Sequence, residues 1–239
     1  MPNNKNDSMT ATPQADAHDF GDGSVPAHRH RNPDGSIGGW VADTAYVALT
    51  ATVDPGACVF DCAWVNRRAR IAENATIKGY ATITGEALVG GNACVDGDAW
   101  VKDRATVRGS AYVAGEATIR SHASVDGRAV IDGHARICSH ASIRDNASIH
   151  DGVIVRGSAE IYGNACLSGL ALVEGGAKVY DQADISGTVH LHGEASVYGN
   201  AIIRDSVVVC DRAQIGGDAN IGGKSILNGD TIIGKLPTF

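Results

Sequence analysis

The sequence has no proline between Pro55 and Pro237, although it contains six prolines in 239 residues. Proline lacks the backbone N–H donor, so within sheets it is confined to edges, strand starts and bulges. Its absence over this long segment indicates a hydrogen-bonded backbone ladder that runs without interruption.

Other absences exclude whole classes of function. The net charge is −7 and no broad basic stripe is present, so we expect no nucleic-acid partner. No apolar run is long enough to span a bilayer, and no charged segment followed by an apolar run resembles a signal peptide. We therefore predict no membrane partner and a cytoplasmic location.

A six-residue repeat fills the proline-free segment. From Val41 to Ile233, every sixth residue is Val, Ile or Leu. Ala stands two residues before most of these positions, and Gly or Asp stands two residues after them. A fixed period of this kind outweighs local propensities in deciding the fold.

The chemistry of the repeat predicts short strands joined by corners. Ala and the aliphatic residue are two apart, so on a strand they point to the same side. Gly and Asp accept positive φ or bond their own backbone, which supplies a corner. If each corner turns the chain by about a third of a circle, three hexapeptides form one triangular coil, and successive coils stack at ~4.8 Å.

Three segments carry a resemblance to known proteins. Asn74-Ala-Thr-Ile-Lys-Gly79 and Asp98-Ala-Trp-Val-Lys-Asp103 resemble the hexapeptide repeat of left-handed parallel β-helices, whose best-known members are trimeric acyltransferases. The segment Gly38-Gly-Trp-Val-Ala-Asp-Thr-Ala-Tyr-Val47 is most similar to the YdcK-like and phage-associated repeat proteins. The resemblance implies an all-β, single-stranded, left-handed parallel β-helix. Handedness follows from the resemblance alone, because parallel crossovers are normally right-handed.

The repeat also predicts the organisation of the chain. Residues 1–24 are polar with one aromatic residue, and we expect a disordered tail. Residues 25–40 should form turns that cap the first coil, with Ile37 and Trp40 as its lid. The β-helix should span residues 41–234, followed by a short C-terminal tail over 235–239.

The six cysteines are expected to be free thiols. Cys58, Cys94 and Cys166 share one outward column, but the nearest two are separated by two coils. Two coils at ~4.8 Å each exceed the usual Cα separation of a disulfide. Free thiols agree with a reducing compartment.

Three histidines are the candidates for catalysis. His122, His134 and His140 each lie three residues after an inward aliphatic residue, at a corner, and His122 and His140 share one column. By resemblance, an acyltransferase would use such a histidine at a subunit boundary with an acyl-CoA donor. Members of that family usually insert a loop between coils, whereas the six-residue repeat here continues from Val41 to Ile233 without an insertion. The column of His122 and His140 also reads as a solvated polar ridge.

Two outward columns are candidates for binding. Tyr162, Tyr180 and Tyr198 recur on successive coils and either stack to stabilise the strands or grip a glycan or protein partner. A second column places four aliphatic side chains on one face, interrupted by His190, which favours a buried contact and predicts a homotrimer. These four residues are Ile154, Leu172, Val208 and Ile226.

A metal site has a weaker signal. His190 and His192 point out of the same strand, and Cys210 lies one coil beyond His192. Imidazole and thiolate ligands suit Zn²⁺, although a flat strand face seldom converges its ligands. Two surface histidines beside a free thiol are the alternative, and we predict no cofactor.

Two functions remain open on the sequence. The first is a non-catalytic β-solenoid that serves as a scaffold or binding module, in a phage-derived setting by resemblance. The second is a trimeric acyltransferase that uses an acyl-thioester donor. Fold alone cannot choose between them, and the missing loop insertion favours the scaffold.

Overall fold

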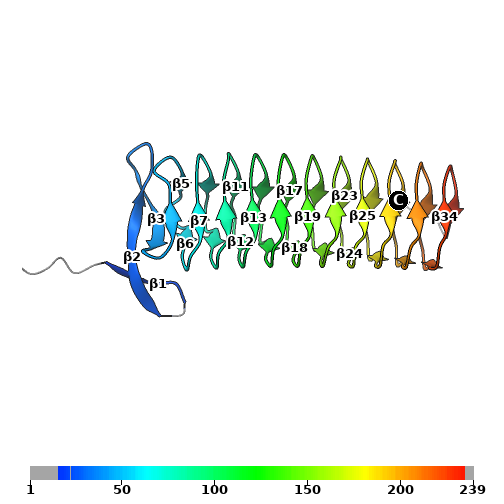
Figure 1. The fold of residues 1–239 in the computed structure, drawn as a ribbon, viewed down its shortest axis with the longest axis horizontal. Helices are drawn as coiled ribbons and strands as arrows, with labels where there is room; N and C mark the ends of the chain where they lie inside the picture. The colour runs from blue at the N-terminus through cyan, green and yellow to red at the C-terminus, as the bar shows by residue number, and fades with distance from the viewer. Residues whose placement is uncertain (1–15, 22, 235–239) are drawn as a thin grey trace, which may run out of the picture.

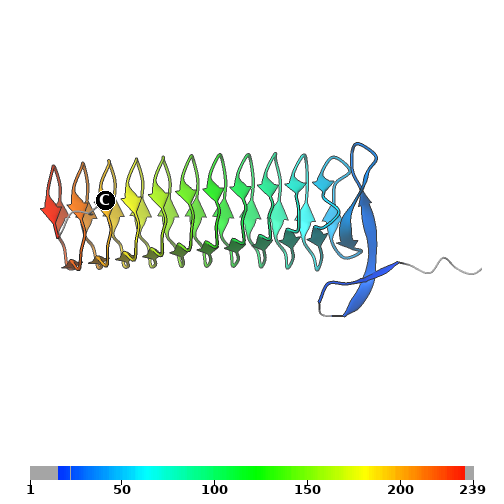
Figure 2. The ribbon, with the colours of Figure 1, turned by 180° about the vertical axis from the view of Figure 1, so that it is seen from behind.

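The computed structural model describes residues 16–21 and 23–234, which form an all-β solenoid of about 11 turns (Figures 1 and 2). Within this part of the chain there is no helix, and therefore none that is long and apolar enough to cross a bilayer. From β3 onward, neighbouring strands of each sheet are 18 residues apart and parallel, as in the pairing of Trp64 with Thr82. The predicted fold class is confirmed.

The strands form three sheets, which are the three sides of the coil. Sheet I has the strand order β1 (Ala17–Asp19), β2 (Ser24–Arg31), β3 (Ile37–Ala42), β6 (Cys58–Val59), β9 (Thr76–Ile77), β12 (Cys94–Val95), β15 (Tyr112–Val113), β18 (Val130–Ile131), β21 (Ser148–Ile149), β24 (Cys166–Leu167), β27 (Asp184–Ile185), β30 (Ile202–Ile203) and β33 (Asn220–Ile221). Sheet II contains β4 (Tyr46–Val47), β7 (Trp64–Val65), β10 (Thr82–Ile83), β13 (Trp100–Val101), β16 (Thr118–Ile119), β19 (Arg136–Ile137), β22 (Ile154–Val155), β25 (Leu172–Val173), β28 (His190–Leu191), β31 (Val208–Val209) and β34 (Ile226–Leu227). Sheet III contains β5 (Thr52–Val53), β8 (Arg70–Ile71), β11 (Leu88–Val89), β14 (Thr106–Val107), β17 (Ser124–Val125), β20 (Ser142–Ile143), β23 (Glu160–Ile161), β26 (Lys178–Val179), β29 (Ser196–Val197), β32 (Gln214–Ile215) and β35 (Ile232–Ile233).

The coil is left-handed. In Figure 1 the chain advances from left to right, while the strands of sheet II that face the viewer point upward and lead over the top to sheet III. The hand agrees with the resemblance of the hexapeptides to left-handed β-helices, and differs from the usual right-handed crossover between parallel strands.

The interior contains the two residues that the repeat predicts. The Ala and the aliphatic residue of almost every hexapeptide have no exposed surface, as at Ala75 and Ile77. At the C-terminal end of the described residues, the inward side chains, among them Ile233, are only partly covered. Burial of these columns is the main favourable contribution to folding.

The corners require a left-handed backbone. Gly occupies most of them, and the other corner residues with φ near +60° are mainly Asp. At seven corners the Asp carboxylate accepts a hydrogen bond from the corner N–H of the next coil, as Asp145 does from Gly163. Asp therefore joins successive coils as well as turning the chain, which the sequence did not indicate.

The N-terminal cap differs from the expected turns. Strand β2 runs antiparallel to β3 across the edge of sheet I, and β1 pairs antiparallel with β2. Two buried polar side chains close the first coil: His30 Nε2 lies 3.1 Å from the Ala51 carbonyl oxygen, and the Asn32 amide bonds both backbone groups of Val53. These bonds satisfy strand groups that have no coil below them.

The expected lid residues lie elsewhere. Ile37 is 61% exposed, and Trp40 points outward, where its ring stacks on His18 at 4.5 Å. Of the expected tail over 1–24, the stretches 16–21 and 23–24 are described and include β1; the rest of that tail lies outside the described residues. So does the expected C-terminal tail over 235–239.

Candidate binding surface

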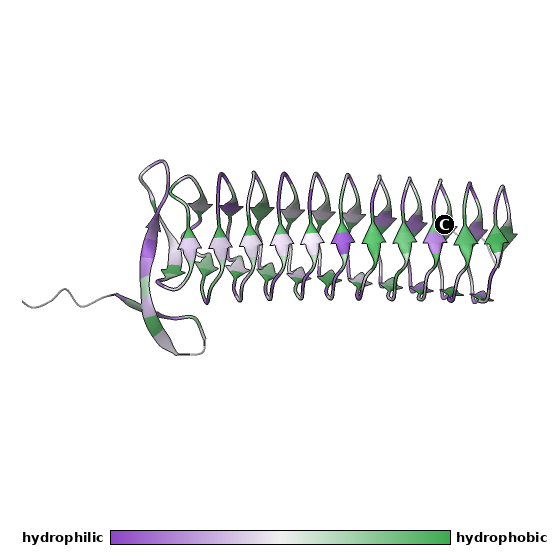
Figure 3. Cartoon of the chain, in the orientation of Figure 1, coloured by the Kyte–Doolittle hydropathy of each residue, from purple (hydrophilic) through white to green (hydrophobic). Residues whose placement is uncertain are grey.

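The outward face of sheet II changes in character along the rod. Its side chains, in order from β4, are Tyr46, Trp64, Thr82, Trp100, Thr118, Arg136, Ile154, Leu172, His190, Val208 and Ile226. Figure 3 shows this face as pale over the first coils, purple at the middle strand and mostly green beyond it. The N-terminal half is thus aromatic and polar, and the C-terminal half is aliphatic.

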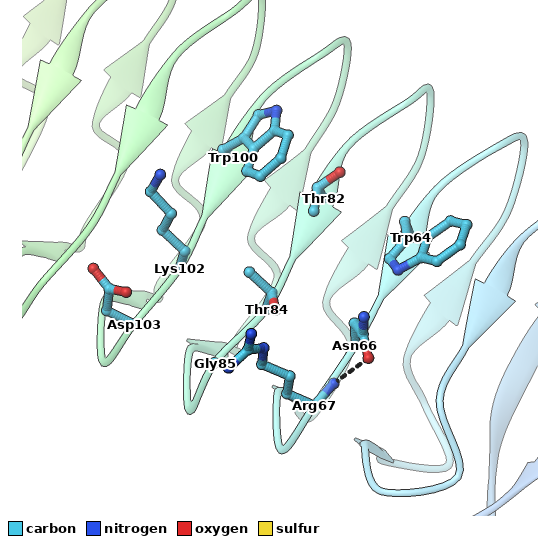
Figure 4. A pocket seen from close by; sticks show the side chains of 9 residues that line it. All are labelled: Trp64, Asn66, Arg67, Thr82, Thr84, Gly85, Trp100, Lys102 and Asp103. Atoms are coloured by element: carbon cyan, nitrogen blue, oxygen red, sulfur yellow. Dashed lines mark hydrogen bonds between the residues drawn. The ribbon is translucent and has the colours of Figure 1, made fainter.

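Two tryptophans project from the N-terminal half of this face. Trp64 is 48% exposed and Trp100 is 45% exposed, and Thr82 lies between them on the intervening strand (Figure 4). Tyr46 packs against Trp64 with ring centroids 4.4 Å apart, and Lys102 Nζ lies 5.4 Å from the centroid of Trp100. Both indole rings therefore have a neighbour that restricts their motion.

Polar side chains surround the two rings in a shallow depression of about 440 Å³. They include Asn66 and Thr84, which follow the strands, and Arg67 and Asp103 at the corners (Figure 4). We call this depression, together with its continuation toward Arg136, the tryptophan trough.

The continuation of the trough is strongly polar. It shares Trp100 and Lys102 with the first depression and adds the column of Asp98, Glu116 and His134 at the corner before sheet II. His134 Nε2 lies 3.4 Å from a Glu116 carboxylate oxygen, and both side chains are exposed. Charged groups of both signs thus border one continuous surface.

The four predicted aliphatic contact residues share the C-terminal half of the face. Ile154 pairs with Leu172 and Val208 pairs with Ile226, with His190 between the two pairs. Ile226 is 70% exposed, and the other three are half-buried by their neighbours in the isolated chain. We call this column the aliphatic strip.

The candidate catalytic histidines do not converge on a cleft. The rings of His122 and His140 stack 5.1 Å apart and nearly parallel on an exposed corner, while His134 lies on a different corner. An acyl-transfer site needs a base beside a bound donor and an acceptor. Among the described residues, neither His122 nor His140 is paired with a carboxylate that could orient its ring, whereas His134 lies beside Glu116 on the continuation of the trough.

The residues around the candidate metal site have other partners. The rings of His190 and His192 are 4.6 Å apart, but His190 Nε2 bonds Glu174, whose carboxylate also binds Arg156. These bonds hold the pKa of Glu174 below its usual value. In the part of the chain that is described, no three His, Cys, Asp or Glu side chains gather as a metal site.

The tyrosine ladder is packed into the side of the rod. Tyr162, Tyr180 and Tyr198 stack with centroids 4.9 and 5.3 Å apart, and Arg144 covers Tyr162. Tyr198 is only 2% exposed, because its ring lies over Gly216 where a Cβ would come within 2.1 Å. The three rings thus share one outward column, as the sequence predicted, but Tyr198 is covered by its neighbours and offers no surface to a partner.

All six cysteines are free thiols, as predicted. Cys58, Cys94 and Cys166 lie on sheet I and are half-buried, and burial raises the pKa of each thiol. A raised pKa lowers the fraction of the nucleophilic thiolate. These cysteines are therefore poor candidates for catalysis.

Comparisons with known proteins add no identity: no family model matches the chain, and no curated protein matches it. The functional interpretation therefore rests on the surface itself.

The repeat did not reveal the tryptophan trough or the buried polar pair of the cap. Trp64 and Trp100 are 36 residues apart, or two coils, so their shared face was available from the period. His30 and Asn32 precede the repeat, and no period marks them as inward residues.

Proposed function

We propose that the chain is a non-catalytic β-solenoid that serves as a rigid binding scaffold. The observation that carries the proposal is the uninterrupted pairing of sheet II from β4 to β34, which displays one outward face along the rod. A strand face fixed on both sides by neighbouring coils positions its side chains with little loss of entropy on binding. The resemblance of the hexapeptides to the left-handed repeat family, and of the entry segment to its YdcK-like and phage-associated branch, supports the same role.

The scaffold self-associates through the aliphatic strip, as a homotrimer. Cyclic closure buries the strip of every copy at once. At roughly 25 cal/mol per Å² of apolar surface, several such side chains contribute a few kcal/mol per subunit before association costs. The six free thiols favour a reducing compartment, and we extend the proposal to a cytoplasmic location.

Light scattering on the full chain tests the assembly. We expect a trimer for the unchanged protein and a monomer for Leu172→Glu combined with Ile226→Glu, because both side chains point away from the core. The matched control is Thr118→Glu with Thr82→Glu, on the same sheet but outside the strip, which should remain trimeric. A monomeric unchanged protein at micromolar concentration would refute self-association.

An assay for acyl transfer tests the proposal that the chain is non-catalytic. The trimeric acyltransferase alternative requires His122, His134 or His140 at a subunit boundary and an acyl-CoA donor. We expect no release of coenzyme A from acetyl-CoA above the background rate with a panel of amine and hydroxyl acceptors. Release that disappears on replacement of one of these histidines by Ala would establish an enzyme instead.

A further inference from the structure

We infer that the tryptophan trough binds an extended, uncharged, β-linked polysaccharide, whose sugar rings lie flat on Trp64 and Trp100. The inference rests on the proposed role as a binding scaffold and adds the chemical class of the ligand.

The two exposed indoles supply the stacking surface. One face of a β-linked pyranose carries axial C–H groups and is apolar, whereas its edge carries hydroxyls. An aromatic ring with an apolar face suits such a ligand, and tryptophan offers the largest one. Tyr46 holds Trp64 and Lys102 holds Trp100, so both rings are ordered before a ligand arrives.

The spacing fits a polymer lying along the rod. Trp64 and Trp100 both pair with Thr82, so they are two strand spacings apart, or roughly 10 Å. One sugar of an extended β-linked chain advances by about one strand spacing, so every second sugar meets an indole. Thr82 between them is short enough for the intervening sugar to pass and offers it a hydroxyl.

The polar groups around the rings match the edge of a sugar. Asn66 and Thr84 lie beside the indoles and provide an amide and a hydroxyl. Such groups can both donate to and accept from sugar hydroxyls. The aromatic centre and polar border are typical of sites that fix a ligand by shape and by a few polar contacts.

The charges favour an uncharged glycan over an anionic one. The basic side chains that line the trough are Arg67, Lys102 and Arg136, and the acidic ones are Asp98, Asp103 and Glu116. The three basic and three acidic side chains balance one another. A balanced border gives no net attraction for a uronate polymer or a nucleic acid.

Binding of neutral hexasaccharides to the full chain tests the inference. The probes are β-1,4-linked glucose, N-acetylglucosamine and mannose hexamers, with oligogalacturonate as the anionic comparison, measured by titration calorimetry. We expect at least one neutral hexamer to bind and oligogalacturonate to bind at least tenfold more weakly. Trp64→Ala and Trp100→Ala should each weaken binding of the neutral hexamer by tenfold or more.

Two further variants separate a lost site from a lost fold. Tyr80→Ala removes an aromatic side chain that is 67% exposed but lies outside the trough, and it should bind as the unchanged protein does. Thr82→Glu keeps both indoles but places a charge between them, and it should abolish binding with an unchanged circular dichroism spectrum.

The outcomes distinguish this inference from the proposed function. No binding by any neutral hexamer, or equal binding by the Trp variants, overturns the inference while leaving the trimer and the lack of acyl transfer intact. Preferential binding of oligogalacturonate also overturns it. Acetylation of a bound hexamer by acetyl-CoA would overturn the non-catalytic role and leave the glycan site standing.

Discussion

At the scale of single residues, the corners show how the backbone selects side chains. Most corners place Gly or Asp at positive φ, but Arg67, Glu73, Ser121 and Ser139 adopt the same conformation. These residues have a weaker preference than Asp for the left-handed backbone conformation, so each of them raises the free energy of the folded state locally. They are the places where the chain departs from its own repeat.

Replacing one of these residues by glycine should stabilise the coil. Ser121 has φ +64°, and its N–H donates to Asp103, a bond that glycine retains. We expect Ser121→Gly to stabilise the fold by about 1 kcal/mol and to raise the melting temperature by ~2–4 °C. Ser124→Gly is the control, because Ser124 lies in extended β17, where glycine destabilises by a similar amount. A lower melting temperature for Ser121→Gly would contradict the argument.

At the scale of elements, the cap depends on a buried neutral histidine. His30 is 4% exposed, and its Nε2–H donates to the Ala51 carbonyl oxygen. Burial lowers its pKa, the bond to Ala51 partly opposes this, and His28 lowers the pKa further. Protonation of His30 therefore favours the unfolded cap, because the pKa of His30 is higher in the unfolded chain than in the folded one.

The cap should consequently loosen in acid. Its stability is fully present above the unfolded histidine pKa of about 6.5 and is lost as the pH falls below it. With Trp64 and Trp100 replaced by Phe, the fluorescence of Trp40 reports on the cap alone, since the chain has three tryptophans. We expect the thermal transition of the cap, followed by Trp40 fluorescence, to occur at a lower temperature at pH 5 than at pH 7.5.

The variant His30→Gln identifies the group responsible. Glutamine keeps a donor for Ala51 and does not titrate, so the difference between the two pH values should largely disappear. An undiminished difference would show that a group other than His30 is responsible.

The tyrosine ladder predicts a second pH effect, at the alkaline end. Burial, and then the neighbouring Tyr162 and Tyr198, raise the pKa of Tyr180 from 10.0 to about 12. The folded state thus keeps a proton that the unfolded state releases. Stability is present below pH 10 and is lost between pH 10 and about 12.

Phenolate absorbance during an alkaline titration measures this shift. We expect the last tyrosine to ionise close to pH 12, together with unfolding, and Tyr180→Phe to remove that late step. Tyr80→Phe changes an exposed ring outside the ladder and should leave the late step in place. A late step that survives in Tyr180→Phe would refute the assignment.

At the scale of the whole molecule, the rod is a one-dimensional stack in which each coil contacts only its neighbours. In such a stack, stability is approximately a sum over coils and their interfaces. Removing one complete coil should therefore preserve the fold, whereas removing part of a hexapeptide should not.

Deletion of residues 122–139 removes 18 residues and joins Ser121 to His140, which recreates the original Ser-His-Ala sequence. We expect circular dichroism to show the same strand spectrum and a cooperative melt within a few degrees of the full chain. Deletion of residues 122–130 is the control, because it places Asp132 and His134 at inward positions and should lower the melting temperature strongly. Similar melts for both deletions would refute a core defined by the hexapeptide.

The sequence alone determined the fold, because a strict period assigns every residue a side of the rod. Ala and the aliphatic residue had to be inward, and residues 18 apart had to be stacked, so the aliphatic strip was predicted residue by residue. Where the period ends, before Val41, the prediction of turns was wrong.

Only the tertiary structure decided the features that depend on contacts across coils and edges. His30 and Asn32 close the first coil because an open sheet edge leaves backbone groups to satisfy, which no local pattern encodes. Tyr198 is buried although it belongs to the outward ladder, because Gly216 on the next coil leaves room for its ring. The trough likewise arises from side chains of several coils and two corners. Its depth depends on how far each of these side chains extends over its neighbours. A period fixes the direction of a side chain, whereas the packing around it fixes what it can bind.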